Sequence, residues 1–403
     1  MIVWSIIHII DIVLWLVMAV SVFYVLFFAL ASLLPKNLTP HPSSPSTFLI
    51  LFPAYHEDSV IRTSVETFLK QDYPRDLYQL VVISDHETDE TNAWLASQPL
   101  TLLTPTFEKS SKAKALQFAI HQVQPSNLNP QTSNLKSHVV ILDADNIVAP
   151  GFLSRLNAEC QKGYRAIQCH RTAKNADNDI AALDGLSEEI NNSIFRRGHN
   201  RVGLSSALIG SGMCFDYSWF SDNVDHLDSA VEDRELEALL LRQDIYIHYA
   251  EDILVMDEKV SSSDNFQRQR LRWMTGQVQA LFRMAPHLLK AFATGNINYI
   301  DKTLQQALIP RSILIMTVPL FALLATLFTP HSPLLTPHSS LIRWWLLVVA
   351  LAVGLFVAIP PQLRTRAIFT KAAALPGMVL RMVRNIFHIE CKNTEFIHTT
   401  HDK

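Results

Sequence analysis

The chain has 403 residues, of which 49% are hydrophobic and 18% are charged, and its formal net charge is -3 at pH 7. This length can bury a sizeable core and still supply membrane segments. The near-neutral balance argues against a nucleic acid as the main partner, because nucleic-acid-binding surfaces carry an excess of Lys and Arg.

The cysteines bear on the compartment of the protein. The four cysteines show no CxxC pairing; they are Cys160, Cys169, Cys214 and Cys391. Their spacing indicates neither a zinc knuckle nor a disulfide framework, and it predicts reduced thiols in a protein that faces the cytosol.

The chain opens with a long apolar run. Residues 12–34 can cross a bilayer and carry no charge after Asp11. A signal peptide is the alternative, because Ala29-Leu30-Ala31 resembles a cleavage site, but a basic leading segment is missing and the run is too long. The sequence therefore predicts an uncleaved transmembrane anchor over 1–34, followed by a Pro/Ser-rich linker over 35–47.

The middle region, 48–280, alternates strand-like and helix-like segments. FLILFPAY, LYQLVVISD, LTLL and VVILDAD have the character of strands, and helices are expected near 59–70 and 88–96. Such alternation predicts an α/β domain in which helices wind around a parallel sheet. The polar stretch 124–138 is expected to be a surface loop.

Three of the predicted strands end in carboxylates. FLILFPAY leads to Glu57, VVISD ends at Asp85, and VVIL is followed by Asp143 and Asp145. Ligands of open parallel sheets sit beyond the carboxyl ends of the strands. A hard cation such as Mg²⁺ or Mn²⁺, shared with a substrate diphosphate, would offset the repulsion between these groups. A solvated turn that caps the next helix is the alternative for the Asp-x-Asp pair.

Seven motifs occur in an order that is similar to the membrane-bound family 2 glycosyltransferases, which include cellulose, chitin and hyaluronan synthases. The motifs are PAYHE (53–57), SDHETDET (84–91), SKAKALQFAI (111–120), DAD (143–145), IGSGMCF (209–215), VED (231–233) and QRLRW (269–273). The resemblance covers roughly 48–275. It implies a GT-A (Rossmann-like) fold, a nucleotide-sugar donor and an inverting mechanism.

The resemblance also implies roles for the strand-end residues. Glu57 and Asp85 match positions that hold the uridine. Asp145 matches the metal ligand. Asp143 matches a position that touches the nucleotide, and it is expected to bind the metal ion together with Asp145. The family commonly writes Asp-Asn where this chain has Asp85-His86. The choice between UDP and GDP therefore stays open.

Two lysines fall where the family places lysines near the diphosphate. They are Lys112 and Lys114, although the usual glycine between them is Ala113. The alternative is a solvated helix face.

Asp233 is the candidate general base. Inversion at the anomeric carbon needs an acceptor hydroxyl that a positioned base makes nucleophilic. Helix capping is the alternative role, because a helical run follows VED.

The QRLRW motif is expected on a helix. There Gln269, Arg272 and Trp273 share one face, while Arg270 points elsewhere. Arg272 can contact phosphate and the Trp273 ring can form a floor for a sugar, and core packing is the alternative. The resemblance places the Trp at the acceptor site, together with Ser211 and Gly212, for which a glycine-rich turn is the alternative.

The last third of the chain predicts further contact with a membrane. An interfacial helix is expected within 281–305, from the mixed segment 278–292, with a core helix as the alternative. Two more spans are expected within 306–360, at 312–328 and 344–359. The region 361–403 is predicted to hold another interfacial helix and a tail. The segment FIHTTH (396–401) of this tail faintly resembles a gating loop, and a disordered terminus is the alternative.

Charge asymmetry predicts the orientation. The connector between the last two spans has no Lys or Arg, whereas the segment after them carries Arg364, Arg366, Lys371, Arg381 and Arg384. The positive-inside rule therefore places the catalytic domain in the cytosol, and a bacterial inner membrane suits this arrangement.

The sequence thus predicts a membrane-bound inverting glycosyltransferase that moves a sugar, from a UDP-hexose, to a growing polysaccharide. A single transfer to a lipid acceptor and a catalytically inactive scaffold or regulatory relative are the alternatives. Three spans are few for a channel that a polymer could pass. A partner subunit, a homo-oligomer or interfacial helices that contact membrane lipids would then complete the channel.

Overall fold

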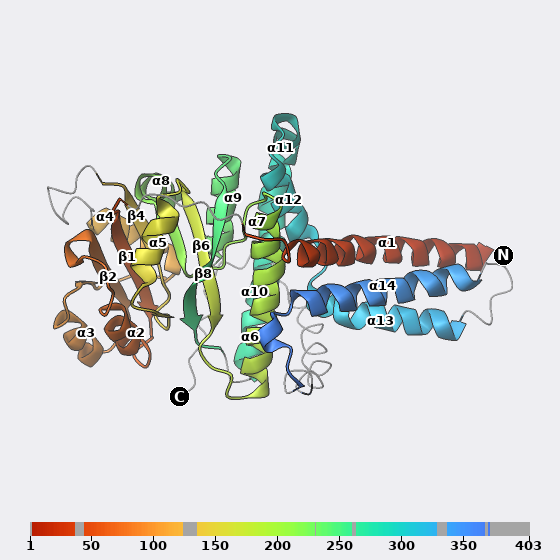
Figure 1. Cartoon of the computed structure of the whole chain (residues 1–403), viewed down its shortest axis with the longest axis horizontal. Coiled ribbons are helices and arrows are strands. Elements are labelled where there is room, and N and C mark those ends of the chain that lie inside the picture. The colour runs from red at the N-terminus through yellow and green to blue at the C-terminus, as the bar shows by residue number, and fades with distance from the viewer. Residues whose placement is uncertain are drawn as a thin grey trace.

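The computed structural model describes residues 2–36, 44–123, 135–229, 231–259, 263–328, 337–366 and 370. An eight-stranded sheet with helices on both faces forms one part of the molecule, and a bundle of long apolar helices projects from its side (Figure 1). The helices α6 (Asp179–Asn191), α10 (Ser263–Met284) and α12 (Ile297–Ala307) lie between these parts.

The sheet has the strand order β3-β2-β1-β4-β7-β6-β8-β5. Its parallel half consists of β3 (Thr101–Leu103), β2 (Tyr78–Asp85), β1 (Thr47–Tyr55) and β4 (Ser137–Ile141). The other half consists of β7 (Met213–Asp216), β6 (Ala166–Ala173), β8 (Ile247–Asp257) and β5 (Ile147–Val148).

The expectation of an all-parallel sheet is wrong for this second half. β7 runs antiparallel to both β4 and β6, and β5 runs antiparallel to β8, although β6 and β8 are parallel. The alternation of strands and helices continues through β4, and the sheet changes direction where the four-residue β7 inserts. Such a short strand carries too little periodicity to be recognised in the sequence.

Alternation along β1 shows how the core is divided. Phe48, Ile50 and Phe52 belong to one apolar cluster, and Leu49 and Leu51 belong to the other. Successive side chains of a strand point to opposite faces, so a strand that is apolar throughout is covered on both sides.

Helices cover both faces of the sheet. The first face packs on α2 (Ile61–Phe68), α3 (Asp89–Ala96) and α5 (Phe152–Cys160). The second packs on α4 (Lys112–Gln122), α8 (Tyr217–Asn223) and α9 (Glu232–Arg242). The helices expected near 59–70 and 88–96 are confirmed. Thr88 and Ser111 cap α3 and α4 by accepting the N–H groups of Thr91 and Lys114.

Short helical segments connect the larger elements. They are η1 (Arg75–Leu77), the π-helix η4 (Asn192–Gly198), α7 (His199–Arg201), η5 (Val224–His226), η6 (Ala285–His287) and η8 (Pro361–Leu363).

The segment 278–292 does not form one continuous helix. α10 ends at Met284, and α11 (Leu288–Thr294) starts after the turn η6, which contains Pro286. Leu289 and Phe292 of α11 are 84% and 63% exposed. This exposed apolar pair suits an interfacial helix, which stays a prediction.

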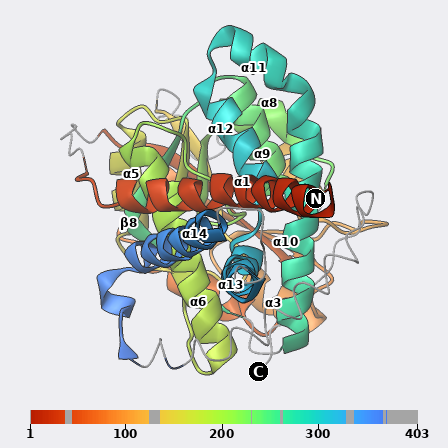
Figure 2. The same cartoon turned by 90° about the vertical axis from the view of Figure 1, so that its right-hand side faces the viewer.

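The bundle contains α1 (Ile2–Ala31), α13 (Arg311–Phe328) and α14 (Pro337–Ala358), and α14 packs against both partners (Figure 2). Among the described residues, two helices are long and apolar enough to cross a membrane, over Ser5–Ala31 and Ser340–Ala358. The third expected span passes this test only as a pair of helices, α12 and α13, bent by 59°.

The one acidic side chain of α1 is neutralised inside the bundle. Asp11 accepts hydrogen bonds from Ser340 (2.8 Å), from the Arg343 guanidinium (2.9 Å) and from the Trp344 indole (2.7 Å). The helix begins at Ile2, ten residues before the expected start of the span at residue 12, and these bonds compensate the charge of the half-buried Asp11.

Some expectations lie outside the described residues. These are residues 124–134 of the expected loop 124–138, the basic positions Lys371, Arg381 and Arg384, and the tail 396–401. The last two residues of that expected loop, Ser137 and His138, belong instead to β4.

Candidate active site

A cavity of about 640 Å³ lies beyond the carboxyl ends of β1, β2 and β4. Nine of the predicted site residues line it: Glu57, Asp85, Lys112, Asp143, Asp145, Asp233, Gln269, Arg272 and Trp273. Three predicted residues, Lys114, Ser211 and Gly212, are not part of this lining. The topology therefore brings together side chains that come from six separate elements and their flanking turns.

The ends of β1 and β2 form one side of the cavity. Their register pairs Tyr55 with Asp85, so Glu57 and Asp85 project from the same edge. The residue after Asp85 is His86, where the sequence resemblance led us to expect Asn. The Nδ1 atom of His86 lies 2.6 Å from Asp85 Oδ1. The φ angle of His86 is 67°, in the left-handed region that Asn tolerates well.

Glu87 supports this edge from behind. Its Oε1 accepts the backbone N–H of Glu57 at 2.7 Å. Burial, together with the nearby carboxylate of Asp58, raises the pKa of Glu87 to about 8, against a smaller opposing effect of the Glu57 N–H.

The two aspartates that follow β4 are held differently. Asp145 is buried, and its two carboxylate oxygens accept the Asn146 side-chain amide (2.9 Å) and the Glu258 backbone N–H (2.7 Å). Asp143 is about one-third exposed at its side chain and forms an ion pair with Lys112. Asn146 fixes the turn by accepting the backbone N–H of Asp143 at 3.0 Å.

Lys112 joins the strand-end carboxylates to α9. Its Nζ donates to Asp143 and to the Gly210 carbonyl (2.6 Å), and it lies 3.5 Å from Glu232 Oε1. Burial alone would lower the pKa of Lys112, but the facing carboxylates of Asp143 and Glu232 raise it. Lys112 is therefore a fixed positive charge beside the carboxylates.

Gly210 lies where the lysine and the base candidate converge. Its φ is +83°, and a Cβ there would lie 3.9 Å from both Asp233 Oδ2 and Lys112 Nζ and 3.8 Å from Glu232 Oε1. These three groups therefore surround one point of the cavity. Burial, followed by the charge of Asp233, raises the pKa of Glu232.

The three predicted residues outside the cavity lining contact other parts of the protein instead. Lys114 is exposed on α4, where its Nζ donates to the Lys109 carbonyl at 2.6 Å. Ser211 is fully buried and donates to Asn146, behind the cavity wall. Gly212 has φ +63°, and a Cβ there would lie 3.0 Å from the Val255 side chain, so close packing accounts for this glycine.

The helix α10 carries the QRLRW residues. Gln269, Arg272 and Trp273 line the cavity together, in agreement with the predicted shared face. The Oε1 atom of Gln269 is buried and has no hydrogen-bond partner within the described part of the chain. An acceptor hydroxyl or another ligand donor could satisfy it.

Arg270 does not point away as the helical spacing suggested. It also lines the cavity, its guanidinium lies 4.6 Å from the centre of the Trp273 ring, and it donates to Asp184. A long arginine side chain can reach around a helix to an aromatic face and a buried carboxylate.

Sequence reasoning missed an ionic network of largely buried residues in the cavity wall. Arg171 lies 2.9 Å from Glu188 and 3.4 Å from Asp257, and Lys259 lies 3.0 Å from Asp257. Burial alone would raise the pKa of Glu188, but Arg171 and Lys259 hold it well below its usual range. Asp257 ends β8, so the rule that pointed to Asp85 could also have pointed to it.

The donor set on this wall fits a hard divalent cation. Asp143, Asp145, Asp257 and Glu258 all contribute to the lining, and carboxylate oxygens are the ligands that Mg²⁺ and Mn²⁺ prefer.

The cavity lining extends into the bundle. It includes Ser21 and Val25 of α1, Ile315 of α13, and Leu355 and Ile359 of the α14 end. The same cavity is therefore bounded by charged groups at the sheet and by apolar side chains from the long helices.

Comparison with protein families gives one match, to a family described as "Glycosyltransferase like family 2", over residues 45–276. This range contains the sheet and the QRLRW helix up to Gly276. No curated protein matches the chain significantly.

Solved structures share the fold. A mannosyltransferase from Pyrobaculum calidifontis in complex with GDP-Man and Mn²⁺ has 16% identity and a TM-score of 0.56, covering 93% of this chain and 99% of that one. This likeness shows a mixed α/β fold of the GT-A type, with apolar helices at both ends of the chain.

Two further structures are more distant. S. aureus TarS 1–349 has 14% identity and a TM-score of 0.40 over 85% of this chain and 90% of that one. Glucosyl-3-phosphoglycerate synthase from Mycobacterium tuberculosis, solved with Mn²⁺ and UDP, has 16% identity and a TM-score of 0.37 over 58% and 82%.

Proposed function

The chain belongs to glycosyltransferase family 2, and is thus an EC 2.4 enzyme that transfers a sugar from a nucleotide sugar, and we propose that it is an inverting enzyme. We place its apolar helices in a membrane and its catalytic domain in the cytosol, and we propose that the acceptor enters from the bilayer.

One observation carries the proposed acceptor class. The cavity that contains the strand-end carboxylates is also lined by Val25, Leu355 and Ile359 from the bundle. Apolar walls favour a ligand with an apolar part, since burying that part releases ordered water. A lipid-linked acceptor would place its hydrophobic portion among the bundle helices and its hydroxyl or phosphate near Asp233.

The proposed reaction follows from the charges around Gly210. Asp233 removes the proton of the acceptor as its oxygen bonds to the anomeric carbon. The bond from this carbon to the diphosphate oxygen breaks on the opposite face, and its electron pair leaves with the diphosphate. Lys112 stabilises the negative charge that grows on this leaving group.

The carboxylates after β4 are proposed to hold a divalent cation. Asp145 and Asp143 would bind it, with Asp257 and Glu258 close by, and the bound ion would neutralise phosphate charge. The mannosyltransferase of similar fold was solved with Mn²⁺, which supports this assignment. Glu57 and Asp85 are proposed to hold the nucleoside.

A growing polysaccharide is the second candidate acceptor. Gln269, Arg272 and Trp273 line the cavity together, and an aromatic ring beside polar groups suits a sugar chain. Ser211, Gly212 and Lys114 retain no direct ligand role in either proposal, because they lie outside the lining.

Donor use is tested by incubating the detergent-solubilised chain with separate UDP- and GDP-sugars, with Mn²⁺ or Mg²⁺, and by measuring release of nucleoside diphosphate. We expect release from one donor, its loss on chelation, and its loss in Asp233→Asn. Asp222→Asn is the matched control, because Asp222 is exposed on α8 outside the cavity. Failure to bind or turn over any donor would favour an inactive scaffold and contradict the proposal.

Acceptor class is tested with the productive donor carrying a radioactive sugar. Lipid extract and soluble oligosaccharides are supplied separately, and the product is partitioned between organic solvent and water. Radioactivity in the organic phase is expected. A water-soluble product of growing length would instead support the polysaccharide candidate.

A further inference from the structure

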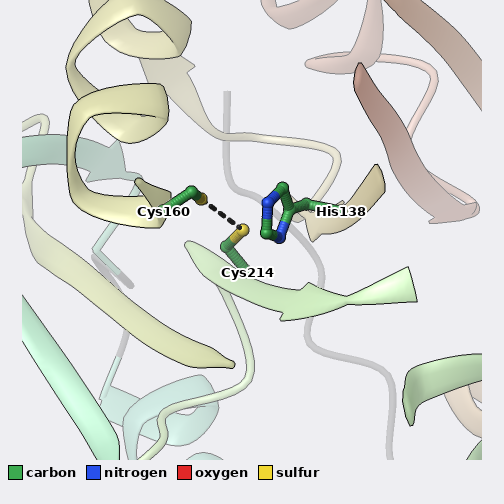
Figure 3. A group of neighbouring side chains, drawn as sticks. All are labelled: His138, Cys160 and Cys214. Carbon is green, nitrogen blue, oxygen red and sulfur yellow. Dashed lines mark hydrogen bonds between the residues drawn. The ribbon is translucent and has the colours of Figure 1, made fainter. Parts of the chain in front are cut away.

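Three side chains outside the cavity form a compact His–Cys–Cys cluster in the core, defined as His138, Cys160 and Cys214 (Figure 3). Their potential ligand atoms all lie within 4.8 Å of one another. None of the three residues lines the active-site cavity, so the proposed glycosyl transfer does not use them.

The fold itself brings these residues together. β4 pairs with β7 in a register that sets Val140 opposite Cys214. His138 is two residues from Val140, and residues two apart on a strand point to the same face. The helix α5 covers this face and ends at Cys160, so its last side chain meets the other two.

The distances suit a tetrahedral metal ion. The sulfur atoms of Cys160 and Cys214 lie 3.8 Å apart. Two thiolates bound to one zinc ion at about 2.3 Å each stand about 3.8 Å apart in tetrahedral geometry.

Burial and an unsatisfied nitrogen provide a second, independent observation. The exposed fractions of His138, Cys160 and Cys214 are 3%, 1% and 1%. The Nε2 atom of His138 has no hydrogen-bond partner among the described residues. Buried imidazole nitrogens normally have a partner, and a metal ion satisfies a lone pair as well as a hydrogen-bond donor does.

We propose that His138, Cys160 and Cys214 supply three of the four ligands of one Zn²⁺ ion, with a buried water molecule as the fourth, at a structural site separate from the cation of the sugar donor. Thiolate and imidazole ligands select zinc over the hard ions Mg²⁺ and Mn²⁺. Two thiolates also balance the double positive charge of the ion, as burial of a metal ion in an apolar core requires.

The site would act on the fold rather than on the reaction. It would tie α5 to the two central strands, and β7 begins three residues after Gly210, which lines the cavity. Because the ligands are buried, zinc would enter during folding and exchange slowly afterwards.

The test is the zinc content of the full chain, purified in detergent with its affinity tag removed. Elemental mass spectrometry of the wild-type protein should find about one zinc ion per chain. Cys160→Ser and Cys214→Ser should each lose it, together with a lower thermal unfolding temperature. Cys169→Ser is the matched control, because Cys169 is buried on the same face of the sheet but outside the cluster.

A measurement on the wild type keeps the proposal testable if a variant fails to fold. Chains expressed with Co²⁺ in place of zinc should show thiolate-to-cobalt charge-transfer absorption. Absence of zinc and of this absorption would overturn the proposal. So would equal zinc content in Cys160→Ser and the wild type, or a Cys160–Cys214 disulfide in freshly reduced and purified protein.

Discussion

The aspartates that flank Ala144 have different tasks because their surroundings differ. Asp145 is buried with both oxygens bound by N–H donors, whereas Asp143 shares its charge with Lys112. A carboxylate that already accepts hydrogen bonds is fixed in orientation, which suits a metal ligand. A carboxylate paired with a lysine can exchange partners when a diphosphate arrives.

Asp145→Asn should lower the rate of transfer at least ~100-fold, since the proposed metal ligand loses its charge. The NH₂ group of the new amide must also face one of two N–H donors, the Asn146 side chain or the Glu258 backbone. That hydrogen bond is lost, so the free energy of unfolding should fall by about 1–3 kcal/mol. Initial rates across a Mn²⁺ titration and thermal unfolding measure the two effects. Asp225→Asn, an exposed change outside the cavity, should alter neither. Wild-type activity in Asp145→Asn would contradict the metal assignment.

Glu87 predicts a pH dependence of stability. Its pKa is about 8 in the folded chain and near 4.5 in the unfolded chain, so the folded state holds the extra proton between these values. Stability from this group is therefore complete below about pH 4.5 and is lost as the pH rises towards 8.

Glu87→Gln should abolish this loss. The amide keeps the acceptor for the Glu57 N–H and carries no charge at any pH. We expect the variant to exceed the wild type by about 1–2 kcal/mol at pH 9 after allowance for partial solvent screening, and to equal it near pH 4.5. Thermal unfolding across this range measures the difference. A difference that did not change with pH would exclude a shifted carboxyl group.

At the scale of elements, the helix α1 is packed onto the catalytic domain rather than tethered to it. The Tyr24 hydroxyl lies 2.8 Å from His199 Nε2 and donates to Asp301 Oδ1 at 2.8 Å. The Phe28 ring stacks on His199 with centroids 3.7 Å apart. The helix α1 thus contacts both α7 and α12.

Gly198→Ala should loosen this contact. A Cβ at Gly198 would lie 2.2 Å from the carbonyl oxygen of Phe28, so the backbone of α1 would have to move. We expect a loss of about 1–3 kcal/mol, seen as a lower unfolding temperature in detergent. In Gly151→Ala the new Cβ would have its nearest neighbour, Asp72, at 3.5 Å, so this control should leave the temperature unchanged. Equal stability of both variants would show that α1 docks more loosely.

At the scale of the whole molecule, the active-site cavity is shared by two parts with different chemistry. Its lining joins strand ends that bear carboxylates to the bundle residues Val25, Ile315 and Leu355. Neither part alone encloses the proposed acceptor. Under the proposed function, the bundle would serve the reaction as well as anchor the chain.

Leu355→Trp should fill the apolar part of the cavity. The KM for a lipid acceptor should rise about tenfold, because the added ring fills the part of the cavity that the bundle lines. The KM for the donor should not change, because the ring does not reach the part lined by carboxylates. Leu346→Trp is the control on the same helix, where the side chain is 63% exposed on the outer face. Equal acceptor KM values for the two variants would place the acceptor elsewhere.

The sequence by itself determined the features that depend on local periodicity. Apolar runs defined the strands β1, β2 and β4 and the helix α1, and carboxylates at the strand ends identified Asp85, Asp143 and Asp145. The spacing of QRLRW placed Gln269, Arg272 and Trp273 on one helical face. These patterns are readable because side-chain direction repeats every two residues in a strand and every 3.6 in a helix.

Tertiary structure decided what depends on packing between distant segments. It set the antiparallel course of β7, turned Arg270 towards Trp273, and left Lys114 outside the cavity. It also brought His138, Cys160 and Cys214 together, although their spacing matches no metal motif. Such contacts arise only when strands pair and helices pack, and no local repeat in the sequence encodes which distant side chains then meet.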